Sequence, residues 1–242
     1  MYDLGNLSES DISTLGAQLE TLGSGAPHME DVANNIVSHL YENLADGADG
    51  AKGCVLARFY KTHLYSLLDP ELQAFSDGVL GESGPPDMRC LTLLATVGEN
   101  AEWNSRANSA GHKAIPLPSE DFVGNIPMIA RLISQLGMDV SAVINPDPAF
   151  LVDLHEHNYN VFHVAEAVGS PYIPAQNDFV VPYGVRSVVG FGGMLSSGEL
   201  YTVILFARAQ ISHETAELFR PLALSVKAAI EPFAGKAVFA NG

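Results

Sequence analysis

The last third of the chain constrains the fold most, because strand-like and helix-like patterns follow one another without a break. Residues 179–195 and 200–208 are rich in β-branched and aromatic side chains, and both segments predict strands. A glycine-containing turn at 196–199 joins them as a hairpin. A helix capped by Ser212 follows over 212–231, with apolar residues every three to four positions. This order predicts a sheet with a helix packed against it.

The first third repeats these patterns in the opposite order. An amphipathic helix is predicted over 29–45, and strands are predicted over 54–62 and 88–97. Strands at both ends of the chain, with helices grouped around them, predict an α+β fold with one central antiparallel sheet and helices on its faces. A shorter amphipathic helix over 8–22 is separated from the rest by glycine and proline. The expected organisation is an N-terminal helical arm (1–27), a main domain (28–235) and a C-terminal tail (236–242).

The middle of the chain, residues 98–178, is expected to be a long helical and loop insertion over the sheet. Residues 116–182 contain eight of the fourteen prolines, which stiffen loops and interrupt helices. Ser119 caps a predicted helix that Pro127 should kink or restart. Asp147-Pro148 predicts the start of another short helix, running to about His155.

Two stretches carry a resemblance to a known family. The ending GFGGMLSSGELYTVILFARAQISHETAELFRPLALSVKAAI, and the start MEDVANNIVSHLYENL followed by CVLARFY, resemble GAF domains, which are related to PAS domains. The resemblance spans roughly residues 29–231. It implies a pocket on one face of the sheet, roofed by 98–178, and a bacterial sensory role. It also implies a homodimer that passes the state of a bound ligand through its terminal helices to a partner such as a histidine kinase or cyclase.

Several side chains in and near this roof are candidate ligand contacts. Small-molecule sites combine apolar walls with a few fixed polar groups. On that basis the candidates are Trp103, His112, Phe162, His163, Tyr172 and Arg186. Trp103, with Arg106 nearby, could stack on a planar or anionic ligand or simply cover the sheet edge. Arg186 could point into the pocket or out to solvent. Tyr172 lies in a proline-stiffened loop that could be a pocket wall or a simple connection.

His163 is the candidate metal or haem ligand. It ends the cluster HEHNYNVFH, and histidine is a common ligand of both. The alternative is a buried histidine satisfied by hydrogen bonds. His155 and His157 could meet one ion only if their segment is extended, because helical residues two apart do not share a face.

Charge and composition narrow the partners. The net charge is −16, and only 12 residues are lysine or arginine. Nucleic acids and anionic membranes are therefore not expected as direct partners, because both require clustered cations. No apolar run approaches the roughly 18 residues of a transmembrane helix. The polar, acidic N-terminus also lacks the pattern of a secretory signal, so a cytoplasmic location is expected.

Recognisable catalytic motifs are missing from the sequence, which favours a binding module over an enzyme. Nucleophile elbows, zinc-protease motifs and phosphate loops do not occur. Cys54 and Cys90 lie within strand-like apolar segments and are expected to be buried, and neither is placed for covalent bilin attachment. The alternative is a small enzyme on the same fold, either a thiol-dependent reductase or a metal-dependent hydrolase.

Overall fold

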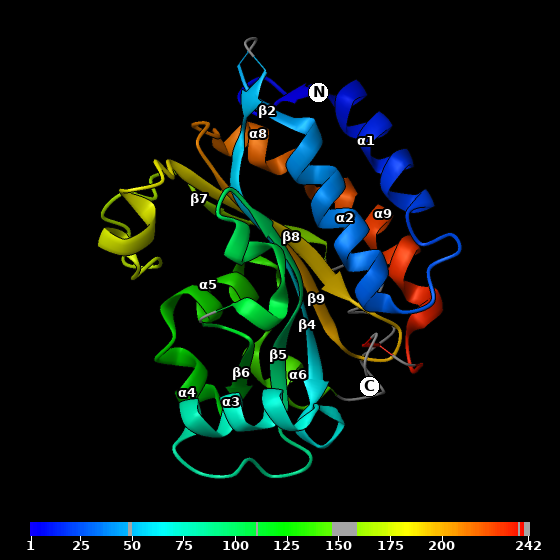
Figure 1. Cartoon of the computed structure of the whole chain (residues 1–242), viewed down its shortest axis with the longest axis vertical. Coiled ribbons are helices and arrows are strands. Elements are labelled where there is room, and N and C mark those ends of the chain that lie inside the picture. The colour runs from blue at the N-terminus through cyan, green and yellow to red at the C-terminus, as the bar shows by residue number, and fades with distance from the viewer. Residues whose placement is uncertain (48–49, 110, 147–158, 237, 240–242) are drawn as a thin grey trace.

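A six-stranded antiparallel sheet organises the protein (Figure 1). The computed structural model describes residues 1–47, 50–109, 111–146, 159–236 and 238–239. The strands, in their spatial order β6-β5-β4-β9-β8-β7, are β6 (Ala114–Leu117), β5 (Arg89–Gly98), β4 (Cys54–Leu64), β9 (Leu200–Ala207), β8 (Ser187–Met194) and β7 (Asn160–Val164). The predicted α+β fold with a central antiparallel sheet is confirmed.

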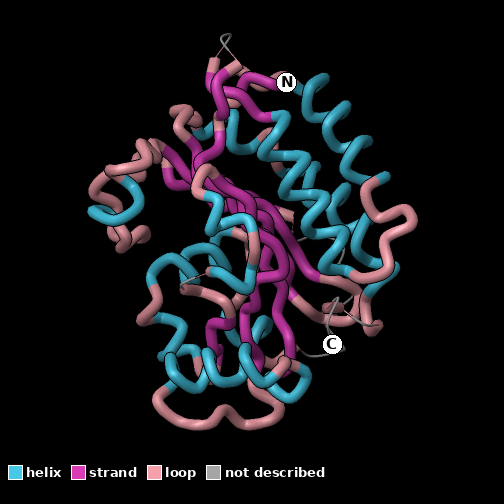
Figure 2. Tube along the Cα trace, in the orientation of Figure 1, coloured by secondary structure: helices cyan, strands magenta, loops and turns pink. Residues whose placement is uncertain are grey.

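Helices cover both faces of this sheet (Figure 2). On one face, here called the α2 face, lie α1 (Glu9–Thr21), α2 (Met29–Asn43) and α9 (Arg220–Ile230). On the other, the α5 face, lie α4 (Glu120–Gly124), α5 (Pro127–Gln135) and α6 (Val140–Ile144), together with residues 165–183. The remaining helices are α3 (Pro70–Leu80), α8 (His213–Glu217) and the short 3-10 helices Tyr65–Leu67, Ala101–Asn104, Arg106–Asn108 and Glu231–Phe233. None of the helices in the described ranges is long and apolar enough to cross a membrane.

The alternation of strand side chains creates two separate apolar cores. Along β4, Ala57 and Phe59 pack into the core on the α2 face, whereas Leu56 and Tyr60 pack into the core on the α5 face. Successive side chains of a strand point to opposite faces, so each central strand contributes to both cores.

The N-terminal helix is part of the α2-face layer, which differs from the separate arm expected for residues 1–27. A capping box between Ser8 and Asp11 starts α1, and Leu15 and Leu19 are completely buried. The helix packs along α9. A small sheet of β1 (Tyr2–Asp3), β2 (Leu44–Asp46) and β3 (Ala51–Lys52) also pairs the N-terminus with the segment after α2. The apolar stripe of α1 is therefore buried within the same chain.

Two elements of the last third differ from the sequence expectation. Only the second half of 179–195 is a strand, since Gln176–Val180 forms a π-helical turn. Pro182 has no backbone N–H to give to a sheet, and Gly184 has a φ of 67°, so the strand begins only afterwards. The predicted 212–231 helix is divided into α8 and α9, and Pro221 lies in the first turn of α9. Proline is tolerated there because first-turn N–H groups have no helical partner.

The insertion supplies both edge strands of the sheet in addition to the helices expected of it. Strand β6 contains Pro116, which is tolerated because an edge strand leaves one side unpaired. Strand β7, which includes Phe162 and His163, forms the opposite edge. The predicted restart at Pro127 is confirmed by the boundary between α4 and α5. The short helix expected after Asp147 lies outside the described residues.

Candidate ligand-binding site

A largely apolar cavity of about 310 Å³ lies between the α5 face of the sheet and the insertion. This volume is near the lower end of the range of about 300–1,000 Å³ typical of small-molecule sites. The sheet contributes Leu56, Arg58, Tyr60, Ile115, Ile204 and Phe206. The opposite wall is made by Trp103, His112, residues 126–129, residues 173–175, Asp178 and Phe179. This is where the sequence placed the pocket, beneath the 98–178 segment.

Aromatic rings form one end of the cavity. Trp103 meets Phe179 edge-on, with centroids 5.5 Å apart, and packs against Tyr183 at 4.6 Å. Phe179 in turn meets Phe206 of β9 at 5.1 Å. The indole ring of Trp103 packs directly against Gly98. A Cβ at position 98 would lie only 2.8 Å from the ring, so a larger residue would displace it. Edge-to-face packing of this kind fixes ring positions, so this wall is well defined before any ligand arrives.

Arg58 brings the one guanidinium among the described residues that line the cavity. It projects from β4 between Leu56 and Tyr60, on the α5 face. Its Nη1 donates to the Tyr60 hydroxyl (3.1 Å) and its Nη2 to the Ser109 hydroxyl (3.3 Å). Its Nε is buried and has no hydrogen-bond partner among the described residues. The side chain is half-buried, and charges withdrawn from water are normally paired, so Arg58 is the most unusual polar group of the site.

His112 lies at the margin of the same cavity in a strained backbone conformation. Its φ of 62° falls in the left-handed region, and no other described non-glycine residue has a positive φ. Desolvation and then the charge of Arg58 lower the pKa of His112, so its neutral form is favoured near pH 7. Strain of this kind is maintained only where the surroundings determine it, and it often occurs at binding sites.

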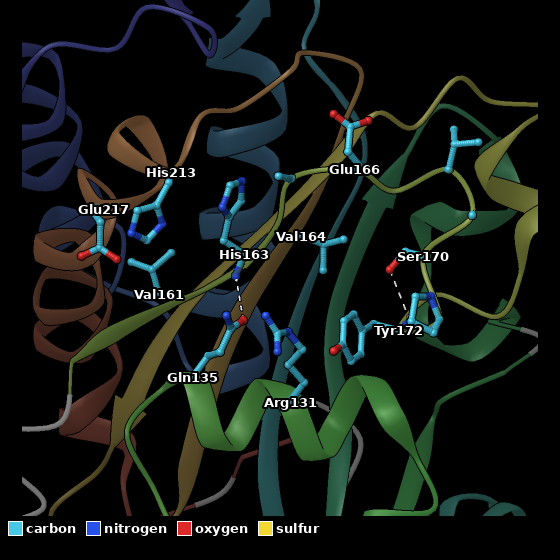
Figure 3. Close-up of a pocket in the computed structure, with 14 residues that line it drawn as sticks. Arg131, Gln135, Val161, His163, Val164, Glu166, Ser170, Tyr172, His213 and Glu217 are labelled. Carbon is cyan, nitrogen blue, oxygen red and sulfur yellow. Dashed lines mark hydrogen bonds between the residues drawn. The ribbon is translucent and has the colours of Figure 1, made fainter.

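A second, more open hollow of about 740 Å³ lies at the β7 edge; we call it the β7 groove (Figure 3). It is bordered by α5, strand β7, the loop 165–172 and α8. Arg131 and Gln135 rise from α5 towards it, and Arg131 lies over the ring of Tyr172 at 4.5 Å. Tyr172 therefore belongs to this groove and not to the aromatic wall of the cavity.

His163 lies in the β7 groove, away from the apolar cavity. Its ring Nε2 is 3.0 Å from the carbonyl oxygen of Ile211, and its backbone N–H donates to Gln135 (3.1 Å). Its ring stacks at 6.2 Å on that of His213 (Figure 3). Desolvation, partly offset by the Ile211 carbonyl, lowers the pKa of His163. These contacts are those of a histidine satisfied by hydrogen bonds.

The described residues offer no group of three or more side chains that could hold a metal ion. His155 and His157 lie outside the described residues, so a metal at His163 stays a prediction. The surroundings of His163 do not fit haem. A haem ligand faces an enclosed apolar slot, whereas this groove is open and bordered by Arg131, Glu166 and Glu217.

The other sequence candidates occupy different environments. Phe162 is completely buried on the α5 face, where it packs over Gly190 of the neighbouring strand. Arg186 is exposed and lines neither hollow; its backbone N–H donates to Ala207. The cavity thus contains Trp103 and His112, the β7 groove contains His163 and Tyr172, and the remaining two candidates belong to neither.

Arg58, Phe179 and Phe206 were missed by the sequence analysis. For Arg58 a signal was present, because a lone arginine interrupts the apolar strand CVLARFY at a position that alternates with Leu56 and Tyr60. The two phenylalanines lie in apolar segments whose pattern is equally typical of the hydrophobic core. The sequence around them therefore does not indicate that they line a cavity.

Comparison with known proteins adds a fold relationship only. No protein-family model matches the chain, and no curated protein matches it. Similar solved structures include the free methionine-R-sulfoxide reductase of Neisseria meningitidis with its substrate (14% identity, TM-score 0.47, 95% of each chain covered). They also include the GAF domain of a phosphoenolpyruvate-protein phosphotransferase from Coxiella burnetii (11%, 0.44, 93% of this chain and 95% of that one). A third is the phycoerythrobilin-bound GAF domain of a cyanobacterial phytochrome (10%, 0.38, 93% and 95%).

The chain has a central antiparallel sheet with helices on both faces, the arrangement that the resemblance to GAF domains implies. These solved structures include GAF domains as well as a reductase, and their identities and TM-scores are low. They therefore transfer neither a ligand nor an activity to this chain. Its function has to be argued from its own cavity.

Proposed function

We propose that this protein is a small-molecule-binding sensory module whose ligand occupies the cavity on the α5 face. The observation that carries the proposal is the cavity itself: it is apolar, about 310 Å³ in volume, and bounded by fixed aromatic rings and a few polar groups. Sites that bind small molecules have this composition.

The thiol-dependent version of the enzyme alternative meets a contrary observation. Cys54 and Cys90 are completely buried, and both belong to the core on the α2 face, across the sheet from the cavity. Burial raises the pKa of Cys54 to about 12 and that of Cys90 to about 11. The nucleophile in thiol chemistry is the thiolate, so neither cysteine is suited to that role.

Signal transmission would use the terminal helices, as part of the same proposal. Helices α1 and α9 pack together on the α2 face, so strands β4, β8 and β9 lie between them and the cavity. A ligand that moves these strands would alter the α1–α9 layer, and through it a homodimer partner or a signalling protein such as a histidine kinase or cyclase. Cytoplasmic location belongs to this proposal as well.

Binding can be tested with a fragment library, using thermal shift and the fluorescence of Trp103, which is the only tryptophan of the chain. Some fragments should raise the melting temperature and change Trp103 emission. Ile129→Phe, which fills the cavity, should abolish both effects. The matched control Leu224→Phe, at a 51% exposed position on α9, should leave them intact. A library that changes neither signal, or an equal response in both variants, would refute the proposal.

Transmission can be tested separately by hydrogen exchange. Addition of a binding fragment should change amide protection in α1 and α9 in addition to the cavity walls. Light scattering on the same sample reports whether the chain is a dimer. If the changes in amide protection were confined to the α5 face, the protein would still bind a ligand, but the proposed transmission through α1 and α9 would be refuted.

A further inference from the structure

In the part of the chain that the structure describes, the cavity contains one strong positive charge, and no carboxylate forms an ion pair with it. Among the described lining residues, Arg58 is the only arginine or lysine, and Asp178 is the only carboxylate. Asp178 is exposed and forms no ion pair with Arg58. The other titratable groups facing the cavity are His112, in the region of Arg58, and Tyr60.

The hydrogen-bond inventory of Arg58 is incomplete. A guanidinium has five N–H donors. The contacts in the described part of the chain are to two neutral hydroxyl groups, those of Tyr60 and Ser109, while the buried Nε–H has no acceptor. Arg58 is half-buried, and a charged group partly withdrawn from water is stabilised by an anion or a full set of acceptors. Arg58 has neither within the described residues.

Thr96 provides a second observation beside Arg58, although it does not itself line the cavity. It pairs directly with Arg58 across strands β5 and β4, so both side chains leave the sheet on the same face. Thr96 is 2% exposed, and its hydroxyl also has no hydrogen-bond partner among the described residues. Buried polar atoms without partners are few in proteins, and two on one cross-strand pair mark a place that an external group could complete.

We propose that the cavity binds a monocarboxylate with an apolar or aromatic body. The carboxylate accepts hydrogen bonds from Arg58, and the body lies against Trp103 and Phe179. The two oxygens of a carboxylate match the forked donors of a guanidinium. A single arginine facing a cavity that also contains Asp178 favours one negative charge over the two of a phosphate monoester. This inference rests on the proposed function, because it assigns a ligand class to the same cavity.

Matched pairs of an acid and its neutral amide test the ligand class. The probes are 3-phenylpropionate against 3-phenylpropanamide and hexanoate against hexanamide, titrated at pH 7.5 with Trp103 fluorescence and calorimetry as readouts. Each acid should bind at least about tenfold more tightly than its amide, the effect of one charge-assisted hydrogen bond. Arg58→Met should remove this preference. Arg131→Met, which removes the guanidinium of the β7 groove instead, should preserve it.

Other outcomes overturn the inference in distinguishable ways. Equal binding of acid and amide would refute the carboxylate but leave the binding function standing. No binding of any probe, in a protein that also fails the fragment test, would refute both. If Arg58 serves only to hold the loop at Ser109, Arg58→Met will lower the melting temperature while the acid preference of the wild type survives in the variant. The proposed role predicts the reverse: the preference disappears, and the ligand-free variant melts no lower than the wild type.

Discussion

Gly192 shows how closely strands β8 and β9 fit together at the scale of single residues. A Cβ at this position would lie 2.1 Å from the carbonyl oxygen of Tyr201 and 2.8 Å from Cα of Thr202. Both are backbone atoms of the neighbouring strand, so a side-chain rotation cannot relieve the clash. At Gly190, two residues earlier on the same strand, the nearest atom would be 3.2 Å away. The two strands therefore approach each other most closely at Gly192.

Gly192→Ala should therefore destabilise the protein by about 3 kcal/mol, at the upper end of the usual cost of overpacking. Gly190→Ala is the matched control and should cost about 1 kcal/mol, since its neighbour needs to move by only a few tenths of an ångström. Urea denaturation of the three proteins measures the difference. Equal costs would show that the strand pair relaxes easily at both positions.

The buried thiols support a second prediction at this scale. Because burial raises the pKa of both cysteines, almost no thiolate is present at neutral pH. An aromatic disulfide reagent should react very slowly with the cysteines of the folded protein. Once the chain is unfolded in urea, the reaction should release two equivalents of the aromatic thiolate, one for each cysteine. Rapid reaction of either thiol in the folded protein would contradict this prediction and would favour the thiol-dependent reductase alternative.

At the scale of elements, α1 behaves as a core helix. Its buried stripe of Ile12, Leu15 and Leu19 joins the same apolar core as α2 and α9, and Gly16 allows close contact with Ser225 of α9. An amphipathic pattern says that a helix must cover something. It does not say what the helix covers, so the sequence left open whether this stripe packs on its own domain or on a partner subunit.

Leu15→Ala should accordingly cost about 2–5 kcal/mol, the usual loss for a fully buried leucine. Ser13→Ala, at an exposed position of the same helix, should change stability by less than about 0.5 kcal/mol. Thermal or urea unfolding distinguishes the two variants. If Leu15→Ala left the free energy of unfolding unchanged, α1 would not be part of the core and the separate N-terminal arm would be the better description.

At the scale of the whole molecule, buried His63 links stability to pH. Desolvation, followed by the charge of Lys61, lowers the pKa of His63 well below its usual value. The folded protein thus keeps this ring neutral, whereas the unfolded chain binds a proton below about pH 6.5. Stability is therefore complete above that pH and falls as the pH decreases towards the folded pKa.

Between pH 7.5 and 5.5 the free energy of unfolding should fall by roughly 1 kcal/mol or slightly more from His63 alone. Three partly exposed histidines with lowered pKa values, His39, His112 and His163, act in the same direction with smaller effects. His63→Phe should flatten this dependence, because an apolar ring replaces the one that resists protonation. Ser13→Ala, at an exposed position of α1, is the control and should leave the slope unchanged. Identical slopes in all three proteins would contradict the assignment to His63.

Much of the fold could be predicted from the sequence because local periodicity carries the information. The stripes of α2 and α1, the strands around 54–62 and 88–97, and the hairpin at 196–199 each follow from the spacing of apolar residues. The edge strands β6 and β7 were missed because each is short and carries a weak pattern of its own. Their pairing partners, β5 and β8, make them strands.

The sequence by itself determined the α+β class with one central antiparallel sheet, and the resemblance to GAF domains implied the segment that roofs the cavity. Only the tertiary structure decided which side chains meet there. Trp103, His112 and Phe179 come from separate loops and turns, and Arg58 comes from the sheet opposite them. A cavity is a space left between elements distant in sequence, so periodicity along the chain cannot specify it. The same is true of the cross-strand pair Arg58 and Thr96, which depends on the register between two strands; each has one buried polar atom without a partner in the described part of the chain.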